Sequence, residues 1–97
     1  MNYDFNILER RAKELVVAGR IQDALTIYFF MADGDPSLDG GYLGQRIGHC
    51  YELLGQYPAA KFWYGRAIEE NPEVRWGGDE AIERLKPLVA IDALLKE

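Results

Sequence analysis

The sequence predicts an all-α protein, an α-α superhelix of two stacked helical hairpins followed by a capping helix. Apolar residues recur at the three- and four-residue spacing of helices, and no strand-like alternation is present. The chain also repeats itself after 36 residues, a period typical of stacked helical hairpins. The recurring residues are Gly19, Ala24, Tyr28 and Pro36, followed by Gly55, Ala60, Tyr64 and Pro72.

The composition is that of one soluble globular domain. The chain has 97 residues, which is too short for two independent cores but enough for one. Of these residues, 48% are hydrophobic. A net charge of −5 disfavours nucleic acid and anionic membranes as partners, because their phosphates would repel the protein. No apolar run approaches the roughly 20 residues that span a bilayer. Since residues 1–4 are unlike the start of a signal peptide, we expect a cytoplasmic protein.

The first hairpin is delimited by residues that start or stop helices. Asp4 is a suitable N-cap for a first helix, and Gly19 is expected to end it. A second helix is expected over about Ile21–Asp33, followed by the breakers Gly34 and Pro36. The residues expected to face the core of this hairpin are Leu8, Ala12, Ala24 and Tyr28.

The second hairpin and the last helix show similar signals. A third helix is expected over about Tyr42–Leu54, and Pro58 suits the first turn of a fourth, which ends before Pro72. Asp79 is expected to cap the last helix, which reaches Leu95. Pro87 lies inside that helix, so a kink or a break is expected there. The residues expected to pack the second hairpin are Ile47, Gly48, Tyr51, Ala60, Tyr64, Ala67 and Pro72.

The second copy resembles a tetratricopeptide repeat through its small, aromatic and proline positions. These are Gly44, Ile47, Gly48, Tyr51, Ala60, Tyr64, Ala67 and Pro72, with Gly44 in place of the family's tryptophan. The resemblance implies one domain over 1–97, with repeats at 5–38 and 41–74 and a capping helix at 79–96. It also implies that Gly48 and Ala60 let the two helices of the hairpin approach closely. Arg11 and Met31 depart from the family pattern in the first copy.

The resemblance further implies that a partner peptide binds in a groove lined by the first helix of each hairpin. In this register the groove residues are Asn6, Glu9, Lys13, Val17, Tyr42, Gln45, His49, Glu52 and Glu83. The alternative is that these side chains form an ordinary solvated face. Glu9 and His49 stand where the variant that binds chaperone tails has lysine and asparagine, so that activity is not implied.

A second candidate surface is aromatic. Phe29 and Phe30 follow Tyr28 directly, so at least one of these rings must lie off the buried stripe of the second helix. Phe62 also occupies a position that is usually polar in the family. These three rings indicate a surface for a partner protein or for a homodimer. The alternative for Phe30 is that it fills the space left by Gly44.

No pattern of catalytic or metal-binding residues is present. His49 and Cys50 are the only histidine and the only cysteine, and neighbours on a helix point about 100° apart. They suit neither a zinc site nor a Cys–His catalytic pair. We therefore expect a non-enzymatic adaptor or scaffold that binds another protein or peptide, with no cofactor. The alternative is a self-associating structural subunit, or an assembly or secretion chaperone, that uses the aromatic surface.

Overall fold

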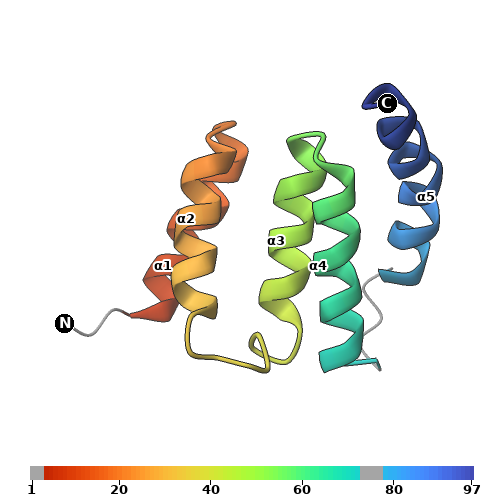
Figure 1. Ribbon diagram of the computed structural model, residues 1–97. Coiled ribbons are helices and arrows are strands. Elements are labelled where there is room, and N and C mark those ends of the chain that lie inside the picture. Colours follow the sequence, from red (N-terminus) through yellow and green to blue (C-terminus); the bar gives the residue numbers. More distant parts are fainter. Residues whose placement is uncertain (1–3, 73–77) are drawn as a thin grey trace.

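The computed structural model describes residues 4–72 and 78–97, and in this part of the chain all regular structure is helical. The helices are α1 (Phe5–Val17), α2 (Ile21–Ala32), α3 (Tyr42–Leu53), α4 (Tyr57–Glu70) and α5 (Gly78–Leu95). Each helix packs against the next one along the chain, so two hairpins stand side by side and α5 covers α4 (Figure 1). The predicted all-α class is confirmed.

The same local structure ends the first helix of both hairpins. Gly19 and Gly55 adopt left-handed backbone conformations, with φ of +79° and +73°. In each case the glycine N–H and the next N–H donate to carbonyls of the last helical turn, which is the Schellman arrangement. At the start of α1, the predicted cap is confirmed, since the Asp4 carboxylate accepts a hydrogen bond from the Asn6 N–H at 2.8 Å.

Helix α5 differs from its prediction in two respects. It begins at Gly78, so Asp79 lies in its first turn and is not the cap; there its negative charge still faces the positive end of the helix dipole. Of the kink or break expected at Pro87, a break is absent, since the helix runs on to Leu95. Proline removes one N–H from the helical ladder, but Pro87 and Glu83 are exposed, so water can satisfy the Glu83 carbonyl.

The linker between the hairpins is organised by one carboxylate. Asp35 accepts hydrogen bonds from the Ser37 N–H at 3.1 Å, the Ser37 hydroxyl at 2.7 Å and the Asp39 N–H at 2.9 Å. Leu38 has a φ of +53°, an unusual value for a residue with a side chain. Its side chain is buried in the core between the hairpins, which holds the linker in this conformation.

The core consists of a large cluster formed by α1, α2, the linker and α3, and a smaller one formed by α4 and α5. Tyr51 packs against both clusters and so joins the two hairpins. The large cluster contains Ala12, Leu15, Ala24, Leu25, Tyr28, Met31, Leu38, Leu43, Ile47 and Cys50. The small cluster contains Ala60, Tyr64, Ala81 and Leu85.

The glycines of α3 have different packing roles from those expected. A Cβ at Gly48 would lie 2.8 Å from Cδ1 of Tyr64, so Gly48 makes room for an aromatic ring. The close approach of the helix backbones is at Gly44, where a Cβ would lie 3.2 Å from the Trp63 carbonyl oxygen. The three atoms nearest to a Cβ at Gly44 all belong to Trp63 and Ala67 of α4.

Candidate functional site

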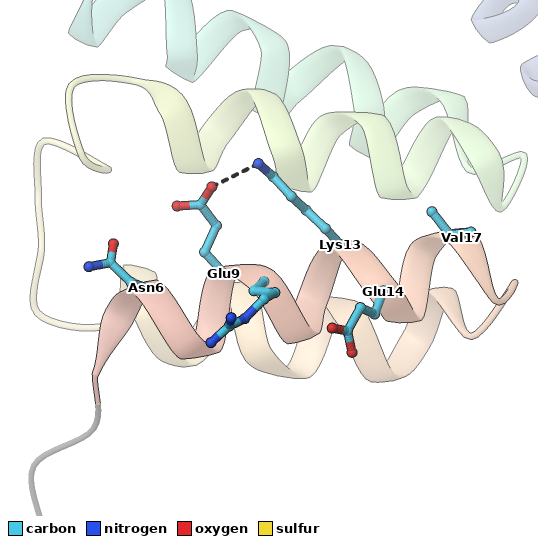
Figure 2. A pocket seen from close by; sticks show the side chains of 6 residues that line it. Asn6, Glu9, Lys13, Glu14 and Val17 are labelled. Atoms are coloured by element: carbon cyan, nitrogen blue, oxygen red, sulfur yellow. Dashed lines mark ion pairs between the residues drawn. The ribbon is translucent and has the colours of Figure 1, made fainter.

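The residues expected to line a groove come from α1, α3 and α5; we call these nine residues, together with Arg84, the inner wall. Four of them line a shallow hollow over α1, beside Arg10 and Glu14. Figure 2 shows these four on the side of α1 that faces α3, with Glu14 on another side. They are Asn6, Glu9, Lys13 and Val17.

Glu9 is the centre of the polar contacts in this first hollow. Its carboxylate pairs with the Lys13 ammonium at 2.9 Å and accepts a hydrogen bond from the Tyr42 hydroxyl at 3.1 Å (Figure 2 shows the ion pair). The hydrogen bond from Lys13 lowers the pKa of the Glu9 carboxyl, and that from Tyr42 adds to the effect. Because Tyr42 belongs to α3, this contact joins the walls of the two hairpins.

A second hollow lies between α3 and α5 and has a volume of about 280 Å³. It brings together Gln45, His49 and Glu52, three of the residues expected in the groove. The remaining lining residues are Leu53, Tyr64, Ala81 and Arg84.

Glu52 is fixed on one side of this second hollow. Its carboxylate accepts hydrogen bonds from the Tyr64 hydroxyl at 2.8 Å and from Nε and Nη2 of Arg84 at 2.7–3.1 Å. Burial disfavours the charged carboxylate, but the hydrogen bonds from Arg84 and Tyr64 outweigh it and lower the pKa of Glu52. Burial and the contact with Glu52 raise the pKa of Tyr64 well above its usual range, so its hydroxyl remains a donor.

His49 and Cys50 are adjacent but have different surroundings. His49 lines the second hollow, and burial, together with the charge of Arg46, lowers the pKa of its imidazole. At neutral pH this ring is uncharged, with one nitrogen donating and one accepting. Cys50 is in the core, where burial raises the pKa of its thiol and keeps it protonated and inert. Within residues 4–72 and 78–97, no group of acidic, histidine and cysteine side chains is placed to hold a metal ion.

Two residues differ from the predicted wall. Glu83 lines neither hollow, and its carboxylate pairs with Lys86 at 2.6 Å on α5. Arg84 was not expected to contribute, yet it provides the cation that holds Glu52. A signal for it exists in the sequence: Glu52 has no lysine or arginine three or four residues away on its own helix.

The aromatic residues form a second surface, on α2 and α4. Phe29, Phe30 and Phe62 are 36%, 48% and 57% exposed. The Trp63 ring lies edge-on to both Phe29 and Phe62, with centroids 5.5 and 5.4 Å apart. The prediction that at least one ring beside Tyr28 lies off the buried stripe is confirmed. We call Phe29, Phe30, Phe62 and Trp63 the outer surface.

Comparison of the chain with protein-family models, curated proteins and solved structures finds no match. Among the described residues, no helix is both long enough and apolar enough to cross a membrane.

Proposed function

We propose that this chain is a tetratricopeptide-like adaptor that binds a segment of another protein on its inner wall and performs no chemistry. The second hollow is the observation that carries the proposal. There Gln45 and His49 of α3 and Arg84 of α5 surround a space bounded by two helices. The Gln45 and His49 side chains make no hydrogen bond or ion pair to a described residue, so they are available to a ligand.

The chemistry of the second hollow suits a peptide. The neutral His49 ring and the Gln45 amide each offer both a donor and an acceptor, which matches the N–H and C=O groups of a main chain. Nη1 of Arg84 makes no hydrogen bond to any described residue and adds a further donor. Leu53 is half exposed at the edge and provides an apolar contact. We therefore expect a segment with mixed polar and apolar residues.

Selection from a library of displayed random peptides tests the proposal. Peptides enriched by the wild-type protein would be measured by isothermal titration calorimetry against His49→Ala and Gln45→Ala. Each variant removes hydrogen bonds to the ligand and is expected to weaken binding by about tenfold, or 1.4 kcal/mol. Lys13→Glu examines the first hollow in the same way.

Phe62→Asp is the control, since Phe62 lies on the outer surface and lines neither wall hollow. It is expected to leave the peptide affinity unchanged. If the selected peptides bind the wall variants and the wild-type protein equally, and lose affinity only with Phe62→Asp, the inner wall is not the binding site.

A further inference from the structure

The outer surface borders two shallow hollows. One hollow, of about 570 Å³, lies between α2 and α4 beside Phe29, Phe30 and Trp63. The other, of about 450 Å³, lies between α4 and α5 beside Phe62. Phe62 and Trp63 separate the two hollows. A surface that carries both an apolar projection and an apolar recess can pair with a second copy of itself, as a two-fold interface requires.

The charges at the two ends of the outer surface are opposite. Asp33 borders the hollow between α2 and α4, and Lys61 borders the hollow between α4 and α5. Helices α2 and α4 run in the same direction (Figure 1), Asp33 follows the end of α2, and Lys61 lies near the start of α4. Neither side chain has an ion-pair partner within the described residues.

We propose that two copies of this chain associate through their outer surfaces in an antiparallel, two-fold arrangement. The Phe62 ring of each copy enters the hollow beside Phe29 and Trp63 of the other. The antiparallel arrangement brings Asp33 of each copy to Lys61 of the other. The two-fold symmetry then gives two Asp33–Lys61 ion pairs in each dimer. The aromatic rings supply the buried area, and the charge pairs set the direction of the two chains.

Sedimentation equilibrium over the micromolar range tests the association. The wild-type protein is expected to be a dimer and Phe62→Asp a folded monomer. The dissociation constant of the dimer is expected to rise by at least about a hundredfold, because the carboxylate would be buried in an apolar recess. Val17→Asp is the matched control: Val17 is 89% exposed on α1, and the same substitution there is expected to leave the dimer intact. A monomeric wild-type protein would overturn the proposal, and the surface would then be open to another class of partner.

Charge reversal identifies the second copy as the partner. Asp33→Lys and Lys61→Asp each place like charges together twice in their own homodimers, and each is expected to weaken association by about tenfold or more. In an equimolar mixture of the two variants, both contacts become attractive again, so dimers with one chain of each kind are expected to form. Circular dichroism confirms that each variant is folded.

A mixture that sediments as monomers would show that Asp33 and Lys61 do not meet, and would overturn the antiparallel arrangement. Neither residue lines a hollow of the inner wall, so these variants are expected to bind selected peptides like the wild-type protein. The proposal of a dimer and the proposal of a peptide site can therefore be refuted independently of each other.

Discussion

Tyr28 and Tyr64 occupy equivalent positions in the two hairpins, yet their hydroxyl groups have opposite partners. Both rings are buried, with 0% and 3% exposure. The Tyr28 hydroxyl accepts a hydrogen bond from Nε of Arg46 at 3.4 Å. The Tyr64 hydroxyl donates to the Glu52 carboxylate at 2.8 Å, and Arg84 holds that carboxylate from the other side.

The difference separates what the repeat preserves from what it leaves variable. The ring fills the core in both hairpins, so its position follows from packing. The hydroxyl reaches the edge of the core, and it can either donate or accept, so it adapts to a cation in one hairpin and to an anion in the other. Two hairpins of the same shape can therefore carry different side chains at the edge of the core, and these side chains can give them different binding properties.

The largest expected effect on stability comes from filling the space that the Tyr64 ring occupies while leaving the space of the Tyr28 ring unchanged. Gly48→Val would place a side chain where the Tyr64 ring lies, since even a Cβ would be 2.8 Å from Cδ1. The equivalent residue in the first hairpin is Ala12, which already carries a Cβ. We expect Gly48→Val to lower the free energy of unfolding by about 3 kcal/mol, measured by urea denaturation.

Gly65→Ala is the control for this substitution. Gly65 lies inside α4, and a Cβ there would have no heavy atom within 4 Å. Alanine is the better helix former, so we expect a stabilisation of about 0.5–1 kcal/mol. Equal effects of Gly48→Val and Gly65→Ala would contradict the contact between Gly48 and Tyr64.

Removing each hydroxyl group in turn tests the comparison directly. Tyr64→Phe removes one of the hydrogen bonds to Oε1 of Glu52 and leaves the one from Arg84, and we expect it to cost about 2 kcal/mol, in the range for hydrogen bonds to charged groups. Tyr28→Phe removes a longer bond from a cation that stays partly exposed, and we expect a cost of about 1 kcal/mol. Urea denaturation of both variants under one condition gives the difference; a larger loss for Tyr28→Phe would reverse our ranking.

The repeat was sufficient to predict where the first helix of each hairpin ends and that three of its ring and small residues are buried, although Pro72, also expected to pack, is exposed. The predicted ends of α1 and α3 and the burial of Tyr28, Ala60 and Tyr64 all follow from a period that is visible without a structure. These features depend on local conformation and on which helix face is apolar, and both are encoded in nearby residues.

The contacts between helices were harder to predict. Arg84 lies 34 residues after Cys50, at the equivalent position of α5, and both point toward the preceding hairpin. The short thiol of Cys50 stays in the core, whereas the long side chain of Arg84 reaches Glu52 with its guanidinium. The roles of Gly44 and Gly48 were exchanged for a similar reason, because the sequence shows that a position is small but not which atoms fill the space beside it.

The smallest expected effect is the dependence of stability on pH, to which His49 and Glu52 of the second hollow both contribute. The pKa of His49 is lowered in the folded protein, so the unfolded chain takes up a proton first as the pH falls below about 6.5, and stability decreases. The pKa of Glu52 is also lowered, so a second decrease follows below about 4.5, where the unfolded carboxyl is protonated and the folded one is not.

Thermal unfolding followed by circular dichroism between pH 7.5 and pH 3.5 measures both steps. His49→Gln is expected to remove the decrease near pH 6, and Glu52→Gln to reduce the decrease below pH 4.5. The Glu9 carboxyl of the first hollow is shifted in the same direction by Lys13 and Tyr42, so part of the acidic decrease persists in Glu52→Gln. The pKa of Arg46 is raised above its usual value, so Arg46 stays charged over this whole range, and the Tyr28→Phe profile should therefore run parallel to that of the wild-type protein. If the dependence of stability on pH in Tyr28→Phe differs from that of the wild-type protein below pH 7, the contacts of Tyr28 and Tyr64 are electrostatically coupled.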